Sequence, residues 1–588
     1  MKKKLLAALL AGSMILSMAA CGNNDSGSSA PADGNGSVES NSGSSESNDA
    51  EESSDAEDAA SDEVVEVTMM VATKSGQGDW NDYWLMDKIE ETCGIRFKVD
   101  QIIKDAWSEK ESLAFATGDL PMVFLNDLTD TELATYGAQG LLLPLEDYIS
   151  KETMPNLYAA MENDNVDLLA GMTFPDGHIY SLRGYTANPR EMAKNRWFIN
   201  KTWMERLGIE KMPETLDEFY DYLVAVRDGD PNQNGDTTDE IPLGGSYKEE
   251  DSFYYSAFIP ILAGFGFLGD AKGADYQVDE NGKVFYIPAH ENYKEFLKYM
   301  HKLYSEKLLD QEYFTQTAEQ RKAKQAEDKY GAFTDYASWM NIPDINVSIQ
   351  FRGLEPFTSE FNSEKMWPSK DMQFNGGLVI TNKVIDEAVI KKLIAMADWF
   401  YSEEGTYTIV RGVPKGEFTA NPEYGWWLGE VDRFGTVKVE NEWDKEKYEK
   451  VGQWRDAEVT PGNNYFPMGQ TLALTSTTIY KEEDYVLTED EAVTNNSRLT
   501  TDIMTNLYDY LKVGWPGTVK FTQEENDEIS LLETDLRNYK ETMESKMING
   551  DLDIDATWDE YIKGLNDRKL DRYVELLQTA YDRWAASK

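Results

Sequence analysis

The residues best suited to chemistry lie in one short loop, which runs from Asp230 to Ile241. Oxygen-bearing side chains occupy its first, third, fifth and seventh positions, and Gly235 at the sixth allows a sharp turn. Hard Ca²⁺ prefers six to eight oxygen ligands, and this spacing wraps them around one point. A polar turn without metal is the alternative. The sequence predicts a structural calcium ion with the ligands Asp230, Asn232, Asn234, Asp236 and Glu240.

Tryptophan and tyrosine residues cluster in polar, glycine-rich surroundings at several places in the chain. Sugars present apolar C–H faces to aromatic rings, and their hydroxyl groups bind carboxylates, amides and arginine. These clusters therefore fit a sugar-binding site, although such rings also fill hydrophobic cores. The candidate ligand-binding residues are Asp79, Trp80, Asn81, Arg196, Tyr336, Trp339, Trp426 and Trp454.

Catalytic signatures do not accompany these residues. The sequence has no G-x-S-x-G, no H-E-x-x-H and no phosphate-binding loop. Its 107 aspartates and glutamates are too many for one pair to be singled out as a glycosidase acid and nucleophile. The three histidines are scattered without metal-ligand spacing. We therefore name no catalytic residue and expect a protein that is not an enzyme.

The elements that must position these residues begin after an export signal. Lysines at the start of the chain precede an apolar run that ends at Ala20, which is typical of a signal peptide over residues 1–20. The segment 17–22 resembles the lipobox of bacterial lipoproteins, whose cysteine carries lipid such as palmitate. We expect Cys21 to be the lipidated first residue of the mature chain. An ordinary secretory signal with an incidental cysteine is the alternative.

The next segment, residues 21–62, is rich in Ser, Gly, Asn, Asp and Glu and has no Lys, Arg or aromatic residue. Such a composition buries too little apolar surface to offset its ordering entropy. We expect a disordered acidic tether with a reach of about 35 Å. No later run has the roughly 18 apolar residues of a membrane-spanning helix.

The remaining chain, about 525 residues, is long enough for two or more large lobes. The formal net charge of −51 excludes binding to nucleic acid or to anionic lipid headgroups. With Cys21 assigned to lipid, Cys93 has no partner for a disulfide within the chain.

The pattern of apolar residues predicts how the body begins and ends. Strands are expected near 64–71, 96–102 and 122–125, with helices between them, which favours an α/β sheet with parallel pairing. Helices are also expected over 291–308 and 386–401, and the final 65 residues are expected to form two long helices.

A series of short motifs carries a family resemblance. They include Ala114 to Pro121, Phe174 to Tyr180, Arg196 to Trp203, Pro213 to Phe219, the Asp230 loop, and Asp398 to Gly405. In this order, after a lipobox and an acidic tether, the chain resembles the extracellular solute-binding proteins of family 1. These are the lipoprotein receptors of carbohydrate ABC importers in Gram-positive bacteria.

This resemblance implies an α/β, two-lobed periplasmic-binding-protein-like fold of type II, with discontinuous lobes and a helical C-terminal extension. Within a solute-binding domain over 63–588, lobe one is expected at about 63–190 and 345–400. Lobe two is expected at about 191–344 and 401–588. The Asp230 loop looks like the calcium site of the family's alginate-oligosaccharide binders.

The resemblance also implies a function. The protein would capture an extracellular solute, above all an oligosaccharide, in a cleft between the lobes and deliver it to the membrane permease subunits of an ABC transporter. It would be a monomer held on the outer face of the cell membrane by its lipid anchor. Two alternatives stay open: a membrane-tethered carbohydrate-active enzyme, and a ligand sensor or adhesin not coupled to import.

Overall fold

The computed structural model describes residues 63–74, 76–125, 128–164, 167–186, 193, 196–247, 252–269, 275–369, 373–431, 437–461 and 495–588. The expected signal peptide, Cys21 and the tether lie outside these residues. Within the described ranges, every helix is too short or too polar to be a candidate membrane span.

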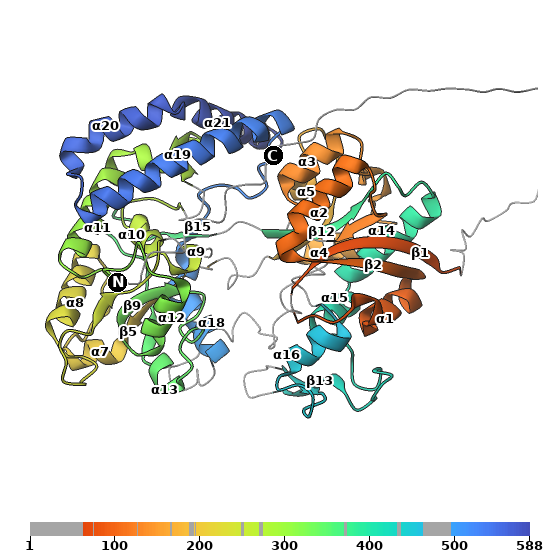
Figure 1. Ribbon diagram of the computed structural model, residues 1–588, viewed down its shortest axis with the longest axis horizontal. Helices are drawn as coiled ribbons and strands as arrows, with labels where there is room; N and C mark the ends of the chain where they lie inside the picture. The colour runs from red at the N-terminus through yellow and green to blue at the C-terminus, as the bar shows by residue number, and fades with distance from the viewer. Residues whose placement is uncertain are drawn as a thin grey trace, which may run out of the picture. The chain divides into compact units, whose positions relative to one another are not determined.

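A five-stranded sheet, here the first sheet, has the strand order β2-β1-β3-β12-β4 (Figure 1). β1 pairs in parallel with β2 and β3, and β12 runs antiparallel to β3 and β4. The expected parallel start of the body is therefore confirmed. The strands are β1 (Val65–Thr73), β2 (Ile95–Ile103), β3 (Val123–Leu125), β4 (Leu182–Thr186) and β12 (Gln373–Ile380).

Period-2 alternation places the side chains of this sheet on two faces. Val123 and Leu125 pack into one core and Phe124 into another, as expected for a strand covered on both sides. The accompanying helices are α1 (Trp84–Cys93), α2 (Lys104–Thr117), α3 (Asp130–Ala138), α4 (Pro155–Asp164), α5 (Leu168–Met172), α14 (Glu387–Tyr401), α15 (Glu403–Arg411) and α16 (Val451–Trp454). Short turns η1 (Trp80–Asp82) and η2 (Glu146–Tyr148), the π-helix η4 (Arg455–Val459) and the hairpin of β13 (Gly425–Val431) with β14 (Val437–Glu442) complete this part.

A four-stranded second sheet has the order β10-β5-β9-β6. Its strands are β5 (Arg196–Asn200), β6 (Ile241–Leu243), β9 (Tyr330–Asp335) and β10 (Phe351–Gly353). Two small pairs accompany it, β7 (Tyr276–Val278) with β8 (Val284–Tyr286) and β11 (Trp367–Pro368) with β15 (Leu511–Lys512). The helices between these strands are α7 (Lys201–Arg206), α8 (Leu216–Asp228), α9 (Ser252–Tyr255), α10 (Phe258–Ala263), η3 (Ile287–Ala289), α11 (Glu291–Ser305), α12 (Ala318–Ala326) and α13 (Ile345–Ser348).

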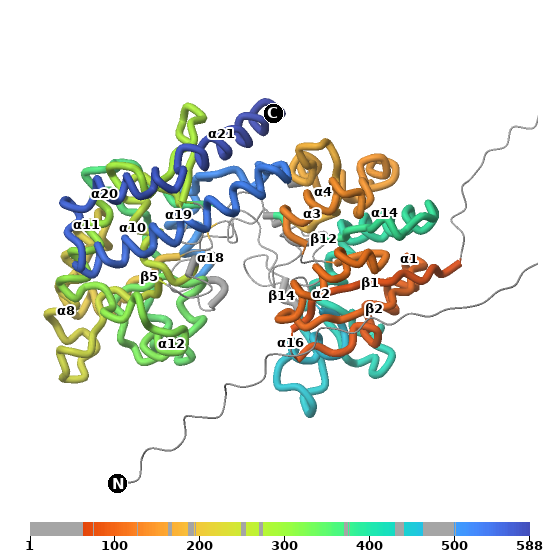
Figure 2. Tube along the Cα trace, turned by 45° about the horizontal axis from the view of Figure 1, so that its top comes forward, coloured from red at the N-terminus to blue at the C-terminus, as the bar shows by residue number. Residues whose placement is uncertain are grey.

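The C-terminal residues form a helical layer on the second sheet's core. After α18 (Asn495–Asn506) and η6 (Tyr508–Tyr510) come α19 (Gln523–Asn549), α20 (Ile554–Asp567) and α21 (Leu570–Ala586). α19 packs beside α11 and α21, as both views of the chain show (Figure 1, Figure 2). The expectation of two long terminal helices was therefore wrong. A third helix arises because Lys569, with φ of 62°, breaks the chain direction between α20 and α21.

Two large hydrophobic cores follow the two sheets, and the chain visits each of them twice. The second core takes Leu354, Phe357 and Trp367, whereas the first core takes Tyr401 and Ile409. α14 and α15 contact each other, and both contribute residues to the first core. A strand placed late in the chain, β12, makes the first sheet discontinuous. The two-lobed α/β fold class is confirmed.

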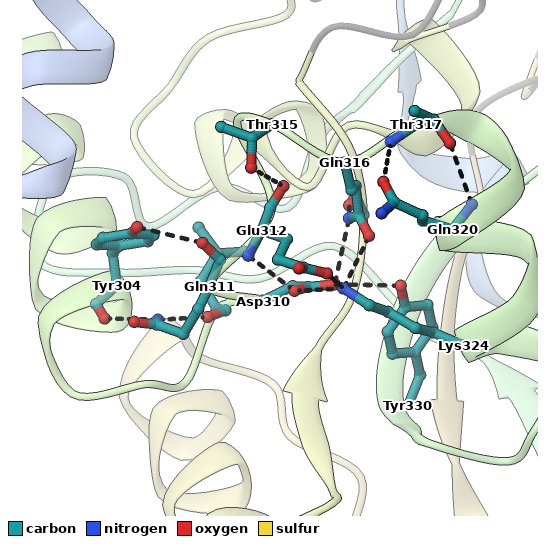
Figure 3. A network of polar contacts seen from close by, with 12 residues as sticks. Tyr304, Asp310, Gln311, Glu312, Thr315, Gln316, Thr317, Gln320, Lys324 and Tyr330 are labelled. Carbon is teal, nitrogen blue, oxygen red and sulfur yellow. Dashed lines mark hydrogen bonds and ion pairs between the residues drawn. The ribbon is translucent and has the colours of Figure 1, made fainter. Parts of the chain in front are cut away.

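A buried polar network fixes the segment between α11 and α12 (Figure 3). Both oxygens of Asp310 lie 2.9 Å from the ammonium of Lys324. Tyr330 on β9 and the amide of Gln316 also donate to Asp310. Because Asp310 is almost fully buried, these charge-assisted bonds tie the loop to the second sheet.

Candidate functional site

Three of the predicted ligand-binding residues gather at one edge of the second sheet. Arg196 begins β5 and pairs with Asp335 at the end of the antiparallel strand β9. The Arg196 guanidinium lies 4.4 Å from the ring centroid of Tyr336 and donates to the Tyr336 carbonyl. Trp339 follows in the next turn, half-buried against the second core. This edge therefore presents aromatic rings beside a fixed positive charge.

A buried carboxylate that the sequence analysis missed organises this edge. Asp335 is fully buried, and it accepts hydrogen bonds from the backbone N–H of Tyr336 at 2.6 Å and from Gln325 Nε2 at 3.0 Å. Asn341 Nδ2 adds a third donor at 2.9 Å. Burial raises the pKa of Asp335, although the donors and the nearby Arg321 oppose the rise. An acidic residue that directly ends a buried strand was the signal in the sequence.

The loop after β1 forms the corresponding edge of the first sheet. The backbone N–H of Gly78 donates to the carbonyl of Asp456 at 3.0 Å. A Cβ at Gly78 would lie 2.1 Å from the Ala457 carbonyl oxygen, so only glycine fits this approach. Asp79 is exposed and caps η1, where its Oδ1 accepts from the Asn81 backbone at 2.9 Å and side chain at 2.8 Å. The chain thus places Asp79 at the carboxyl edge of a parallel sheet, where ligands of such folds bind.

Other candidates from the same loop have structural roles. The Asn81 side chain bonds in both directions with the backbone of Val99, at 2.9 and 3.1 Å, which ties it to β2. Trp80 is fully buried and stacks with Tyr83. Trp454 is 1% exposed and packs in the same first core. The two tryptophans are therefore core residues, and their rings do not face a ligand.

Trp426 does not line either edge and is held by two contacts of its own. Its indole N–H donates to the carbonyl of Gly412 at 2.9 Å, and its ring stacks on Tyr407 at 5.1 Å between centroids. The ring lines a separate pocket with residues of α1 and α15.

The Asp230 loop is a tight coil of side-chain-to-backbone bonds. Asp230 accepts from the backbone N–H groups of Asn234 and Gly235, both at 3.1 Å. Asn232 Oδ1 accepts from Asn234 N at 2.9 Å, and Asn234 Oδ1 accepts from Asp236 N at 2.7 Å. The predicted oxygen ligands therefore stand on one compact turn.

The carboxylate of Glu240 lacks a compensating partner among the described residues of this loop. Both of its carboxylate oxygens are buried and meet no hydrogen-bond donor in the described chain. Burial, with Asp239 and Asp230 nearby, raises the pKa of Glu240. A buried carboxylate without donors is costly unless a cation compensates it, so the residues present fit a bound cation. Across the described residues, no group of three or more His, Cys, Asp or Glu forms a metal cluster. The donor set here instead mixes carboxylates with amide oxygens, as Ca²⁺ accepts.

Known proteins of one function class are similar to this chain. The profile of the bacterial extracellular solute-binding protein family matches residues 75–350. The fructooligosaccharide ABC transporter substrate-binding protein FusA of Streptococcus pneumoniae serotype 4 is 27% identical over 525 residues, which cover 87% of this chain and 88% of FusA. The chain is similar to the bacterial extracellular solute-binding proteins, whose profile it matches over residues 75–350. The profile and FusA both represent solute-binding proteins.

Solved structures agree on the fold of this solute-binding protein. An HMO-binding, ABC-transporter-associated solute-binding protein from Bifidobacterium longum infantis superposes with a TM-score of 0.70 at 20% identity. The match covers 88% of this chain and 99% of that structure. The family resemblance drawn from the motifs is confirmed.

Two similar structures are described in terms of an EF-hand or a calcium ion. One FusA structure is an EF-hand mutant in complex with fructo-nystose. It superposes with a TM-score of 0.66 at 23% identity, and the match covers 89% of this chain and 100% of the FusA chain. The structure of the alginate-binding protein AlgQ2 without calcium ion superposes with a TM-score of 0.58 at 21% identity. This match covers 89% of the present chain and 99% of the AlgQ2 chain.

Proposed function

We propose that this solute-binding protein is the oligosaccharide receptor of an ABC importer. The observation that carries the proposal is the 27% identity to a fructooligosaccharide-binding protein along most of both chains. The discontinuous first sheet supports it, since the chain must pass repeatedly between two lobes that can close on a ligand.

The two cores support revised lobe boundaries. Lobe one comprises 63–186 and 373–461, and lobe two comprises 196–369 and 495–588. Ligand stabilises the closed arrangement because it binds the closed state better than the open one.

The ligand-binding groups come from the facing edges of the two sheets. Trp339 and Tyr336 supply rings for the C–H faces of a sugar, and the exposed Asp79 supplies an acceptor for its hydroxyls. Arg196 is 2% exposed and orients Tyr336. We keep Asn81 as a residue that orients Asp79, because its own amide is bound to Val99.

Calcium stabilises lobe two in this proposal. Asp230, Asn232, Asn234, Asp236 and Glu240 hold the ion, and the unpaired oxygens of Glu240 support this assignment. When bound, Ca²⁺ neutralises the loop and fixes the start of β6. Its role is structural, since no ligand-binding candidate is on the loop.

Lipid at Cys21 anchors the receptor to the outer face of the membrane, and the acidic tether gives it reach toward the permease subunits. The protein contacts the membrane only through this anchor and acts as a monomer.

Calorimetry on the mature protein tests the proposal with kestose, nystose, xylotriose, mannotriose, maltotriose and trigalacturonate. We expect at least one neutral oligosaccharide to bind and to raise the melting temperature. If every sugar fails while a peptide panel binds, the oligosaccharide assignment is wrong. Binding accompanied by release of new reducing ends would favour an enzyme instead.

A further inference from the structure

A pocket of about 440 Å³ is lined by residues of α1, of α15 and of the start of β13. Its walls include Trp84 and Lys88 from α1, Tyr407 from α15, and Trp426 from β13. A volume of this size is within the range of small-ligand sites.

Aromatic rings form a rigid platform in this pocket. Trp426 and Tyr407 stack with an interplanar angle of 27°, and the bond from Trp426 to the Gly412 carbonyl fixes the indole. Trp84 is 8% exposed and Tyr407 is 9% exposed, so both rings are held by packing. A preformed aromatic surface of this kind suits the apolar face of a sugar ring.

Two side-chain donors at the pocket make no hydrogen bond to the described part of the protein. Within the part of the chain that the structure describes, neither the indole N–H of Trp84 nor the phenol of Tyr407 has an acceptor, and neither donor atom is enclosed by protein. Both side chains line the pocket, so both donors are open to a ligand with hydroxyl oxygens.

The charges around the pocket exclude one class of ligand. Glu403, Glu404 and Glu417 line it, and Lys88 is the cation among them, 3.9 Å from Glu417. This excess of carboxylates repels anionic sugars such as uronates and offers acceptors to neutral hydroxyls.

The pocket has a different set of lining residues from the ligand edges described above. Asp79, Tyr336 and Trp339 do not line it, whereas Trp84, Tyr407 and Trp426 do. We therefore treat it as a second site.

We infer that this pocket binds one uncharged sugar unit, as a second carbohydrate site on lobe one. The inference rests on the proposed function in that both sites take the same class of ligand. It assigns Trp426 as the stacking platform, Trp84 and Tyr407 as donors, and the glutamates as acceptors.

Native mass spectrometry and ligand-detected NMR on the mature protein test the inference, with kestose, nystose and maltotriose as neutral probes and trigalacturonate as the anionic probe. Wild type should take up a second equivalent of at least one neutral probe and none of the anionic one. Trp426→Ala should weaken that second equivalent about 10-fold or more. Tyr407→Phe keeps the ring packing and should weaken it about 3-fold to 10-fold, the loss of one hydrogen bond.

Trp427→Ala is the matched control, since this adjacent tryptophan does not line the pocket. It should leave both equivalents within about 2-fold of wild type. Trp339→Ala should weaken only the first equivalent, which separates the pocket from the proposed cleft. A single equivalent that both pocket variants retain overturns the second site and leaves the proposed function standing. Tight uptake of trigalacturonate in the pocket also overturns the inference, and no binding of any probe overturns both claims.

Discussion

Asp130 Oδ2 lies 2.5 Å from the ammonium of Lys520, which joins two residues 390 positions apart in the chain. Asp130 opens α3 on the first sheet, and Lys520 precedes α19 of the C-terminal layer. Arg183 on β4 adds a second cation, 2.7 Å from the other oxygen of Asp130. One carboxylate thus neutralises two cations whose side chains are 8% and 5% exposed.

Asp130→Asn should therefore destabilise the protein more than the loss of one surface ion pair. The variant leaves two buried cations facing each other, and we expect a loss of about 2–4 kcal/mol in the free energy of unfolding. Denaturant titration measures it. Lys520→Met is the control, because Asp130 keeps Arg183, and its loss should be about 1 kcal/mol. Equal stability of Asp130→Asn and wild type would contradict the role of this joint.

The ion pairs of Asp130 with Arg183 and Lys520 also predict that the stability of the protein depends on pH. Burial works against the charge of Asp130, but Arg183 and Lys520 outweigh it and hold its pKa below the usual value. A lowered folded pKa contributes stability above the unfolded pKa, and that stability is lost as the pH falls through the folded pKa. Acid titration of stability should show this loss in wild type and less of it in Asp130→Asn. Parallel acid profiles for the two proteins would argue against it.

Trp339 should contribute to ligand affinity but not to the stability of the fold. Trp339→Ala removes a half-buried ring at the edge of the second sheet, and we expect at least about a 10-fold loss of oligosaccharide affinity in calorimetry. Trp443→Ala is matched in type and burial, since Trp443 is also half-buried and donates to the Tyr448 carbonyl at 3.1 Å. Its affinity should equal that of wild type. A similar loss in both variants would mean that the effect comes from instability.

Calcium should stabilise the protein through Glu240. The folded pKa of Glu240 is raised by burial, so the metal-free protein should lose stability as the pH rises from about 4.5 through that folded pKa. Bound calcium favours the ionised carboxylate and should remove this loss. At 100 times its Kd the ion adds about 2.7 kcal/mol, visible as a higher melting temperature.

Glu240→Gln should abolish most of the calcium response while the metal-free variant is at least as stable as wild type near neutral pH. Glu210→Gln changes an exposed glutamate outside the loop and should keep the full response. The outcome against the proposal is a melting temperature that chelator leaves unchanged in wild type.

Buried residues of the C-terminal helical layer should contribute to stability as residues of a hydrophobic core do. Trp558 on α20 is 4% exposed, and Trp558→Ala should cost about 3–5 kcal/mol of unfolding free energy. Leu531 on α19 is 76% exposed, so Leu531→Ala should change stability by less than about 0.5 kcal/mol. Thermal unfolding of the two variants measures the difference, and similar melting temperatures would show that the layer is not part of the second core.

Helical and strand periodicity predicted α1, α11, α14 and β1 to β3 to within a few residues, because each buries one regular stripe of its own side chains. Periodicity alone does not decide the burial of Leu531 on α19, which is exposed. A 27-residue helix has more than one apolar stripe, and only its neighbours decide which of them is buried.

Local spacing by itself determined the oxygen-rich loop at Asp230, and the family resemblance of the short motifs implied the solute-binding class, because both depend on residues close together in the chain. Tertiary structure alone decided which aromatic rings are available. Trp80 and Trp454 stand beside polar residues in the sequence, as Trp339 does, yet they lie in the first core. Pairings such as Arg196 with Asp335, or Asp130 with Lys520, join distant segments whose register no local pattern encodes. Burial and long-range pairing are properties of the packed sheets, and for that reason the binding edges became visible only in the fold.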